Sequence, residues 1–166
     1  MQRLLISACL LGEPVRFDGG HKRLARERLE TWRREGRCLV VCPECLGGLP
    51  VPRPAAEIVG GDGRDVLTGD AQVVDDRGRR YDTAFVDGAH KALQQAQQAG
   101  VRLALLKANS PSCGSGTIHD GQFSGGKRAG DGVFASLCRQ AGIEVFDETR
   151  FDALAERLAE LEAGGG

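Results

Sequence analysis

The sequence predicts an α/β protein, a single Rossmann-like three-layer domain with a mostly parallel sheet and a small β-hairpin insertion. Short runs rich in Leu, Ile and Val alternate along the chain with amphipathic segments of helix length. Such alternation is typical of parallel strands joined by helical crossovers. The 166 residues are enough for one domain with its own core. We expect this domain to span residues 1–163 and the glycines at 164–166 to form a disordered tail.

The first elements follow from local patterns. Residues 3–9 are a continuous apolar run that predicts a buried strand. Residues 23–35 place apolar side chains at roughly helical spacing, and Gly36 ends that helix. Residues 38–42 predict a second strand, which Pro43 terminates because proline cannot donate to a ladder.

The middle of the chain is less regular. Residues 47–63 are dense in Gly and Pro and cannot be regular throughout. Residues 71–76 and 79–83 flank an Asp-Arg-Gly turn and predict a small antiparallel hairpin. A long helix is expected over residues 83–99, with Asp82 as its N-cap.

The last third completes the alternation. Residues 101–106 predict a third buried strand, and a Gly-rich stretch over 114–132 leads into a helix at 133–140. Residues 143–146 predict a fourth strand. A final helix from residue 151 places its apolar side chains on one face.

Composition narrows the class of partner. Lys and Arg total 22 against 23 for Asp and Glu, so the net charge is -1. This balance gives no basic footprint for a nucleic acid polymer, and a small neutral molecule is the expected partner. No apolar run approaches the length of a signal-peptide core or a membrane span. We therefore expect no membrane association and a cytoplasmic location, and the oligomeric state is not predicted.

Three of the six cysteines carry the strongest functional signal. Cys9, Cys42 and Cys113 each lie at or just after the carboxyl end of a predicted strand. These ends converge on one crevice in an open parallel sheet, which is the usual ligand site of such folds. Three thiolates from three loops match a 4Fe-4S cluster whose fourth iron has no protein ligand. The alternative is that the three thiols remain reduced in the core.

The other cysteines and the histidines have simpler interpretations. Cys38 and Cys138 fit strand and helix packing as small apolar side chains. Cys42 and Cys45 form a CxxC pair, which also occurs in thioredoxin-like redox sites. A closed zinc site would need two such pairs and is disfavoured. The three histidines lack a second histidine at ligand spacing and are expected to be surface or hydrogen-bonding residues: His21, His90 and His119.

Several separated motifs together resemble one family. They are Ser7-Ala8-Cys9-Leu10-Leu11-Gly12 with Val15-Arg16-Phe17-Asp18-Gly19, Cys42-Pro43-Glu44 with Leu46-Gly47-Gly48-Leu49 and Pro52-Arg53, Gly60-Gly61-Asp62-Gly63, Ser110-Pro111-Ser112-Cys113-Gly114, and Asp120-Gly121-Gln122-Phe123. In this order, over roughly residues 3–148, they are similar to the signatures of the thiouracil desulfidase (TudS) family.

The resemblance implies an enzyme that removes sulfur from thiolated uracil without net redox change. It implies a 4Fe-4S cluster held by Cys9, Cys42 and Cys113 with one open iron, and catalytic roles for Glu44 and Ser110. The expected substrates are 2-thiouracil, 4-thiouracil or a thiouridine nucleotide, and the expected products are uracil and hydrogen sulfide. A salt bridge or a helix-terminal carboxylate is the alternative role for Glu44, and a turn hydroxyl is the alternative for Ser110.

Cys45 departs from the family pattern, since many relatives have an aliphatic residue there. This fourth thiol near the cluster could cap the open iron, protect it or have no role. We expect it to point away from the cluster and serve packing.

Four further residues are candidates for binding the substrate. Ser112 flanks a ligand cysteine, and Arg16 and Phe17 lie in a loop able to cover the base. Lys127, in a Gly-rich loop before a helix, is a candidate for holding a phosphate, although a flexible solvated loop is the simpler interpretation.

Two other functions stay open at this point. One is an iron-sulfur or redox sensor without turnover. The other is a thiol-disulfide enzyme that uses Cys42 and Cys45 and needs no iron.

Overall fold

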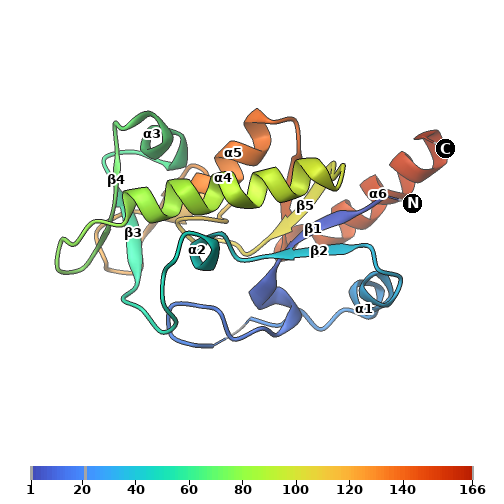
Figure 1. Ribbon diagram of the computed structural model, residues 1–166, viewed down its shortest axis with the longest axis horizontal. Helices are drawn as coiled ribbons and strands as arrows, with labels where there is room; N and C mark the ends of the chain where they lie inside the picture. The colour runs from blue at the N-terminus through green and yellow to red at the C-terminus, as the bar shows by residue number, and fades with distance from the viewer. Residues whose placement is uncertain (1, 21, 166) are drawn as a thin grey trace.

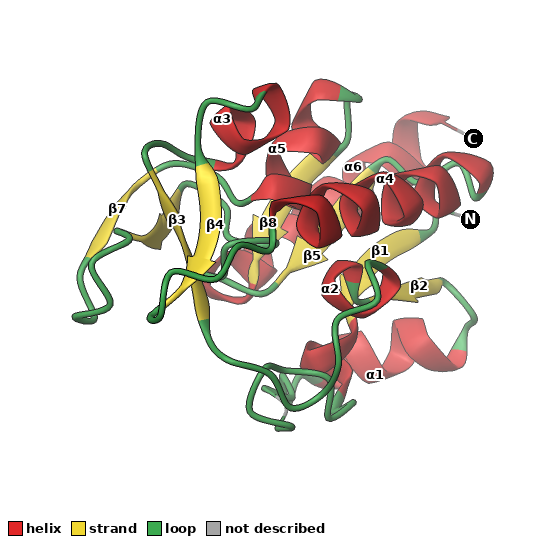
Figure 2. Ribbon diagram, turned by 60° about the vertical axis from the view of Figure 1, so that its left-hand side comes forward, coloured by secondary structure: helices red, strands yellow, loops and turns green. Residues whose placement is uncertain are grey.

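A four-stranded parallel sheet forms the centre of the molecule. The computed structural model describes residues 2–20 and 22–165. The strands are β1 (Leu4–Ser7), β2 (Cys38–Val41), β5 (Leu103–Leu106) and β8 (Glu144–Asp147), in the order β2-β1-β5-β8 (β1, β2 and β5 are labelled in Figure 1, and all four strands in Figure 2). All three pairings are parallel. The predicted fold class is therefore confirmed.

Helices cover both faces of this sheet. Helices α1 (Glu27–Arg34) and α6 (Phe151–Gly165) pack on one face, and α4 (Asp82–Gln98) and α5 (Val133–Gln140) pack on the other (Figures 1 and 2). The two faces follow from the alternation of side chains along each strand.

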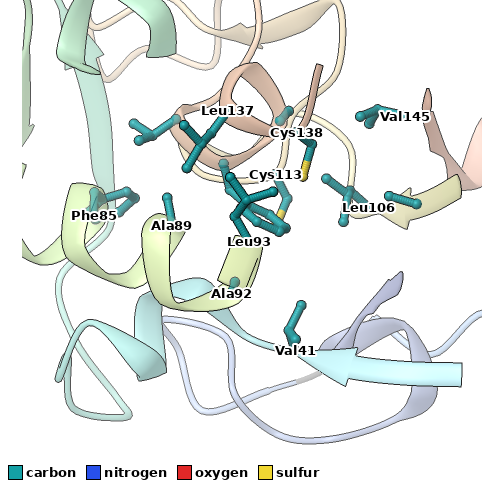
Figure 3. Packing of buried hydrophobic residues seen from close by; sticks show 14 of the residues in the cluster. Val41, Phe85, Ala89, Ala92, Leu93, Leu106, Cys113, Leu137, Cys138 and Val145 are labelled. Carbon is teal, nitrogen blue, oxygen red and sulfur yellow. The ribbon is translucent and has the colours of Figure 1, made fainter. Parts of the chain in front are cut away.

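The alternation is visible in β1, where Leu4 and Ile6 join the core under α1 and α6, and Leu5 joins the core under α4 and α5. Figure 3 shows the second of these cores, with Cys113 and Cys138 among its buried side chains.

Short elements complete the fold. They are the 3-10 helices η1 (Ala8–Leu11) and η2 (Glu148–Arg150), the helices α2 (Pro43–Leu46) and α3 (Gly63–Thr68), and the strands β3 (Ala56–Val59), β4 (Gln72–Asp75), β6 (Thr117–His119) and β7 (Lys127–Ala129). Strands β3 and β4 form one antiparallel pair, and β6 and β7 form another. No helix in the described part of the chain is both long and apolar enough to cross a membrane.

The predicted hairpin has a different partner from the one expected. The first predicted strand, residues 71–76, contains β4, but β4 pairs with β3 from the Gly- and Pro-rich segment. The second predicted strand, residues 79–83, is joined to the first through the isolated bridge between Val74 and Arg80. The buried Asp75 carboxylate accepts hydrogen bonds from the backbone N–H groups of Arg77 and Arg79 and from the Tyr81 hydroxyl. These contacts lead the chain into α4, so residues 79–83 do not form the second strand of a hairpin.

Three element boundaries also differ from the prediction. Helix α1 begins at Glu27 because residues before it run beside η1, where the Leu24 N–H donates to the Leu10 carbonyl. Asp82 is the first residue of α4 and not its N-cap, since its carboxylate accepts a hydrogen bond from the Val73 N–H. Helix α6 continues through Gly165, beyond the expected start of the disordered tail, and residue 166 lies outside the described residues.

A close approach between α2 and α4 positions the start of α2. A Cβ placed on Gly88 of α4 would lie 1.9 Å from the Pro43 carbonyl oxygen. A Cβ placed on Gly47 would lie 2.0 Å from the Ala84 carbonyl oxygen. Two glycines therefore allow the backbones of α2 and α4 to touch, and this contact holds the segment that follows β2.

We predict that Gly88→Ala destabilises the protein by about 1–3 kcal/mol, the usual cost of overpacking, although alanine favours helices by about 1 kcal/mol over glycine. Urea unfolding measures the change. Gly164→Ala is the matched control, because Gly164 is also helical and has open space around its Cβ position. Equal stability of the two variants would contradict the close approach.

Candidate active site

A cavity of about 240 Å³ lies at the carboxyl ends of β1, β2 and β5. The chain passes from β1 to β2 on one side and returns past β1 to reach β5 on the other. This reversal of strand order creates the crevice in which open α/β sheets bind ligands. Side chains from the loops after all three strands line the cavity.

The cavity brings together the three cysteines that the sequence singled out. Cys9 lies in η1 directly after β1, Cys42 precedes α2, and Cys113 lies in the loop after β5. All three are free thiols; Cys9 and Cys113 are buried, and Cys42 is half-buried. Three soft donors from three separate loops therefore face one space.

Burial keeps these thiols protonated when no metal is bound. It raises the pKa of Cys42 to about 12 and raises the pKa of Cys113 above its ordinary value. Burial also raises the pKa of Cys9, although the positive charges of Arg16 and Lys107 oppose this shift. A metal that binds here must displace protons from the thiols.

Three cysteine thiols are a donor set that suits an iron-sulfur cluster. Within residues 2–20 and 22–165, no three His, Cys, Asp or Glu side chains are grouped closely enough to hold one metal ion. In an iron-sulfur cluster each thiolate binds a different iron, so the sulfur atoms stand farther apart than the ligands of one ion. Thiolates are also the preferred ligands of such clusters.

The loop that carries Cys113 also presents two serines to the cavity. The Ser110 hydroxyl accepts a hydrogen bond from the Cys113 N–H at 2.7 Å. This contact fixes the serine side chain and leaves its hydrogen free to donate. The Ser112 side chain is buried in the cavity lining, with Oγ 4.0 Å from the Cys113 sulfur.

Glu44 lies in the first turn of α2 and forms an ion pair with Arg53. The Arg53 side chain is only 4% exposed, and it also donates to the carbonyls of Pro50 and Val15. A buried guanidinium needs such partners because an unpaired charge is costly. The pair uses Oε2 of Glu44. Arg53 belongs to the Pro52-Arg53 motif, for which the sequence alone predicted no role.

Two of the candidate substrate-binding residues in the loop after η1 line the cavity. Arg16 and Phe17 are half-buried there, with the Arg16 guanidinium 5.5 Å from the Phe17 ring centre. Lys127 does not join them, because it is exposed on β7 and absent from the cavity lining. The structure brings Ser112, Arg16 and Phe17 together and leaves Lys127 apart.

His119 is a cavity residue that sequence reasoning did not select. It ends β6 and lines the cavity, and its Nδ1 atom is buried without a hydrogen-bond partner among the described residues. A single histidine gives no sequence pattern that predicts a place in the cavity. His119 reaches the cavity because the neighbouring Ile118 forms a bridge with Asn109 in the loop after β5. His90 is exposed, and His21 lies outside the described residues.

The remaining cysteines do not line the cavity. The Cys45 thiol lies beside the Cys42 thiol, whose pKa burial and this neighbouring thiol both raise, and the Cys45 sulfur is 4.0 Å from the Val15 carbonyl oxygen. Cys138 is fully buried in the core between α4, α5 and the sheet, and Cys38 is half-buried in β2 beside the other core. Both agree with packing roles.

Comparisons with known proteins identify the family of the chain and agree with its fold. The chain is 43% identical to a solved structure of the 4Fe-4S-dependent thiouracil desulfidase TudS, with a TM-score of 0.88 over 96% of this chain and 99% of that one. It is 42% identical to the Bacillus subtilis (strain 168) uncharacterized protein YbbK over 90% of this chain and 97% of that protein. The model of the 2-thiouracil desulfurase family matches residues 4–150. The chain therefore belongs to the 2-thiouracil desulfurase family.

Proposed function

We propose that this protein is a 4Fe-4S-dependent desulfidase that converts thiolated uracil and water into uracil and hydrogen sulfide. The observation that carries the proposal is the convergence of Cys9, Cys42 and Cys113 on one cavity that also contains Glu44 and Ser110. The reaction exchanges a thiocarbonyl for a carbonyl, so it needs no electron donor or acceptor. The substrates are 2-thiouracil, 4-thiouracil or a thiouridine nucleotide.

Cys9, Cys42 and Cys113 would hold the cluster through one thiolate each, which would leave one iron without a protein ligand. When bound, the cluster supplies a Lewis-acidic iron for the soft sulfur of the substrate. The neutral thiols lose their protons as the cluster is assembled. The burial of Cys113, which is 6% exposed, limits the access of water from that side of the site.

Glu44 acts as the general base. Its Oε2 atom is held by Arg53, and Oε1 accepts a proton from the water that attacks the ring carbon. The Arg53 guanidinium fixes the carboxylate in place, because Arg53 is itself tied to the Val15 and Pro50 carbonyls. The same carboxyl group then returns this proton to the departing sulfur. The second proton of the water leaves the ring hydroxyl as the carbonyl forms and completes hydrogen sulfide.

The other cavity residues orient the pyrimidine. The Ser110 hydroxyl, fixed by the Cys113 N–H, donates its hydrogen to a ring oxygen or relays a proton. Ser112 lines the wall beside it, while Arg16 and Phe17 close the side formed by the loop after η1. The His119 imidazole, which lacks a partner at Nδ1 in the described structure, hydrogen-bonds the polar edge of the ring.

We predict that the protein, reconstituted anaerobically with iron and sulfide, binds close to four irons per chain and releases hydrogen sulfide and uracil from 2-thiouracil or 4-thiouracil. Iron analysis and product quantification measure both quantities. Cys113→Ala is expected to lose the cluster and the activity together. Cys38→Ala is the control and should keep both, since Cys38 packs in the core under α1 and α6 and does not line the cavity. Cys45→Ser should also keep both, because Cys45 does not line the cavity.

Other outcomes would identify the rival functions. Activity that survives without iron but is lost in Cys45→Ser would indicate a thiol-disulfide enzyme. A stable cluster with no turnover of any thiolated uracil would indicate a sensor. Failure of the wild-type protein to bind iron would overturn the cluster site itself.

We predict that Glu44→Gln lowers kcat by about 100- to 10,000-fold, the usual contribution of a general base, while iron content stays at the wild-type level. The amide cannot accept the proton of water but fills the same space. Steady-state kinetics on protein matched for iron content measures the effect. Wild-type kcat in this variant would exclude Glu44 as the base.

We predict that His119→Phe raises KM for thiouracil about 10-fold with little change in kcat, because an unmatched buried polar group costs about 1–3 kcal/mol. His119→Gln keeps a hydrogen-bonding group and should recover part of the affinity. Titration with the product uracil provides an independent measure of binding. Unchanged KM in His119→Phe would remove His119 from the substrate site.

A further inference from the structure

Ser7 is a buried polar residue at the carboxyl end of β1 to which the proposed reaction assigns no role. The residue is buried, with only 3% of its surface exposed. Its Oγ atom accepts a hydrogen bond from the Lys107 N–H at 3.0 Å and lies 3.4 Å from the Cys113 sulfur. A hydroxyl has one hydrogen. Because Lys107 already donates to Oγ, the geometry directs this hydrogen to the sulfur of Cys113.

The carboxylate of Glu148, directly after β8, anchors the backbone that contacts Ser7. Glu148 of η2 accepts a hydrogen bond from the Ala108 N–H at 2.7 Å through Oε1. Its Oε2 atom pairs with the Lys107 ammonium at 2.7 Å. The backbone at Lys107 and Ala108 is therefore clamped where it meets Ser7. A continuous set of contacts runs from Glu148 through the end of β5 and Ser7 to the Cys113 sulfur.

We propose that Ser7 is a positioning residue for the iron-sulfur cluster, whose hydroxyl donates to the Cys113 thiolate, fixes the direction of that ligand and stabilises the more electron-rich state of the cluster. This inference rests on the proposed cluster. Hydrogen bonds to a ligating sulfur raise the reduction potential of iron-sulfur centres. Groups that hold a ligand in place also retain the metal.

Ser112 does not duplicate this role. Its Oγ atom lies 4.0 Å from the same sulfur, against 3.4 Å for Ser7. Cys113 is the donor in that longer contact, and it no longer has a hydrogen to donate once it is a thiolate ligand. The short contact from Ser7 is the one that remains when metal is bound.

The test compares Ser7→Ala with Ser136→Ala. Ser136 is a buried serine of α5 that accepts a hydrogen bond from Gln140 and does not line the cavity. Both variants are reconstituted with iron and sulfide, and the midpoint potential of the cluster and its iron retention against a chelator are measured. Ser7→Ala is expected to show a more negative potential and roughly 10- to 100-fold weaker iron retention. Ser136→Ala should match the wild type.

A second pair keeps the test decisive if Ser7→Ala does not fold. Ser7→Thr and Ser7→Val add similar bulk, and only threonine keeps the hydroxyl. The threonine variant should show a potential close to that of the wild type, and the valine variant should show a potential as negative as that of Ser7→Ala. Equal potentials and equal iron retention in this pair, or a wild-type potential in folded Ser7→Ala, would overturn the role of Ser7.

The test is independent of desulfidase activity. A wild-type protein that holds a cluster but converts no thiouracil would contradict the proposed function, while the potentials would still decide the role of Ser7. A wild-type protein that binds no iron would overturn both.

Discussion

The strand order of the parallel sheet is the constraint on which the site depends. Because β1 lies between β2 and β5, the ends of all three strands open onto the same cavity. Val41 is paired with Ser7, so Cys42 and Cys9 emerge from neighbouring strands at nearly the same level. Cys113 reaches them from the loop after β5. The three cysteines are far apart in the sequence, and the sheet brings them together.

Arg53 gives the rest of the site a fixed geometry. The loop after η1, the start of α2 and the segment before β3 are all irregular or short, and none is rigid by itself. One buried guanidinium contacts the Val15 carbonyl, the Glu44 carboxylate and the Pro50 carbonyl. The backbone contact of α2 with α4 at Gly88 adds a second restraint. The Glu44 carboxylate, which we propose as the general base, is therefore held from two sides.

The sequence carried enough information to predict the sheet and the cysteine convergence, because both follow from hydrophobic runs and from their order. It did not reveal the pairing of β4 with β3, since only Ile58 of β3 is fully buried and the segment around it is rich in Gly and Pro. Nor did it identify His119 or the partners of Arg53. Those placements depend on contacts between residues far apart in the chain, which leave no local pattern.

The protonation of the three cavity thiols explains why their burial is compatible with a stable fold. Burial raises the pKa of Cys9, Cys42 and Cys113, so the metal-free cavity holds neutral thiols and carries little electrostatic cost. Under the proposed function, the three thiols lose their protons when iron supplies compensating positive charge. Lys107 and Arg16 then lie close enough to Cys9 to stabilise its thiolate. The neutral thiols add little electrostatic cost to the fold without the cluster, and the proposed cluster site would couple the charge of these thiols to cluster assembly.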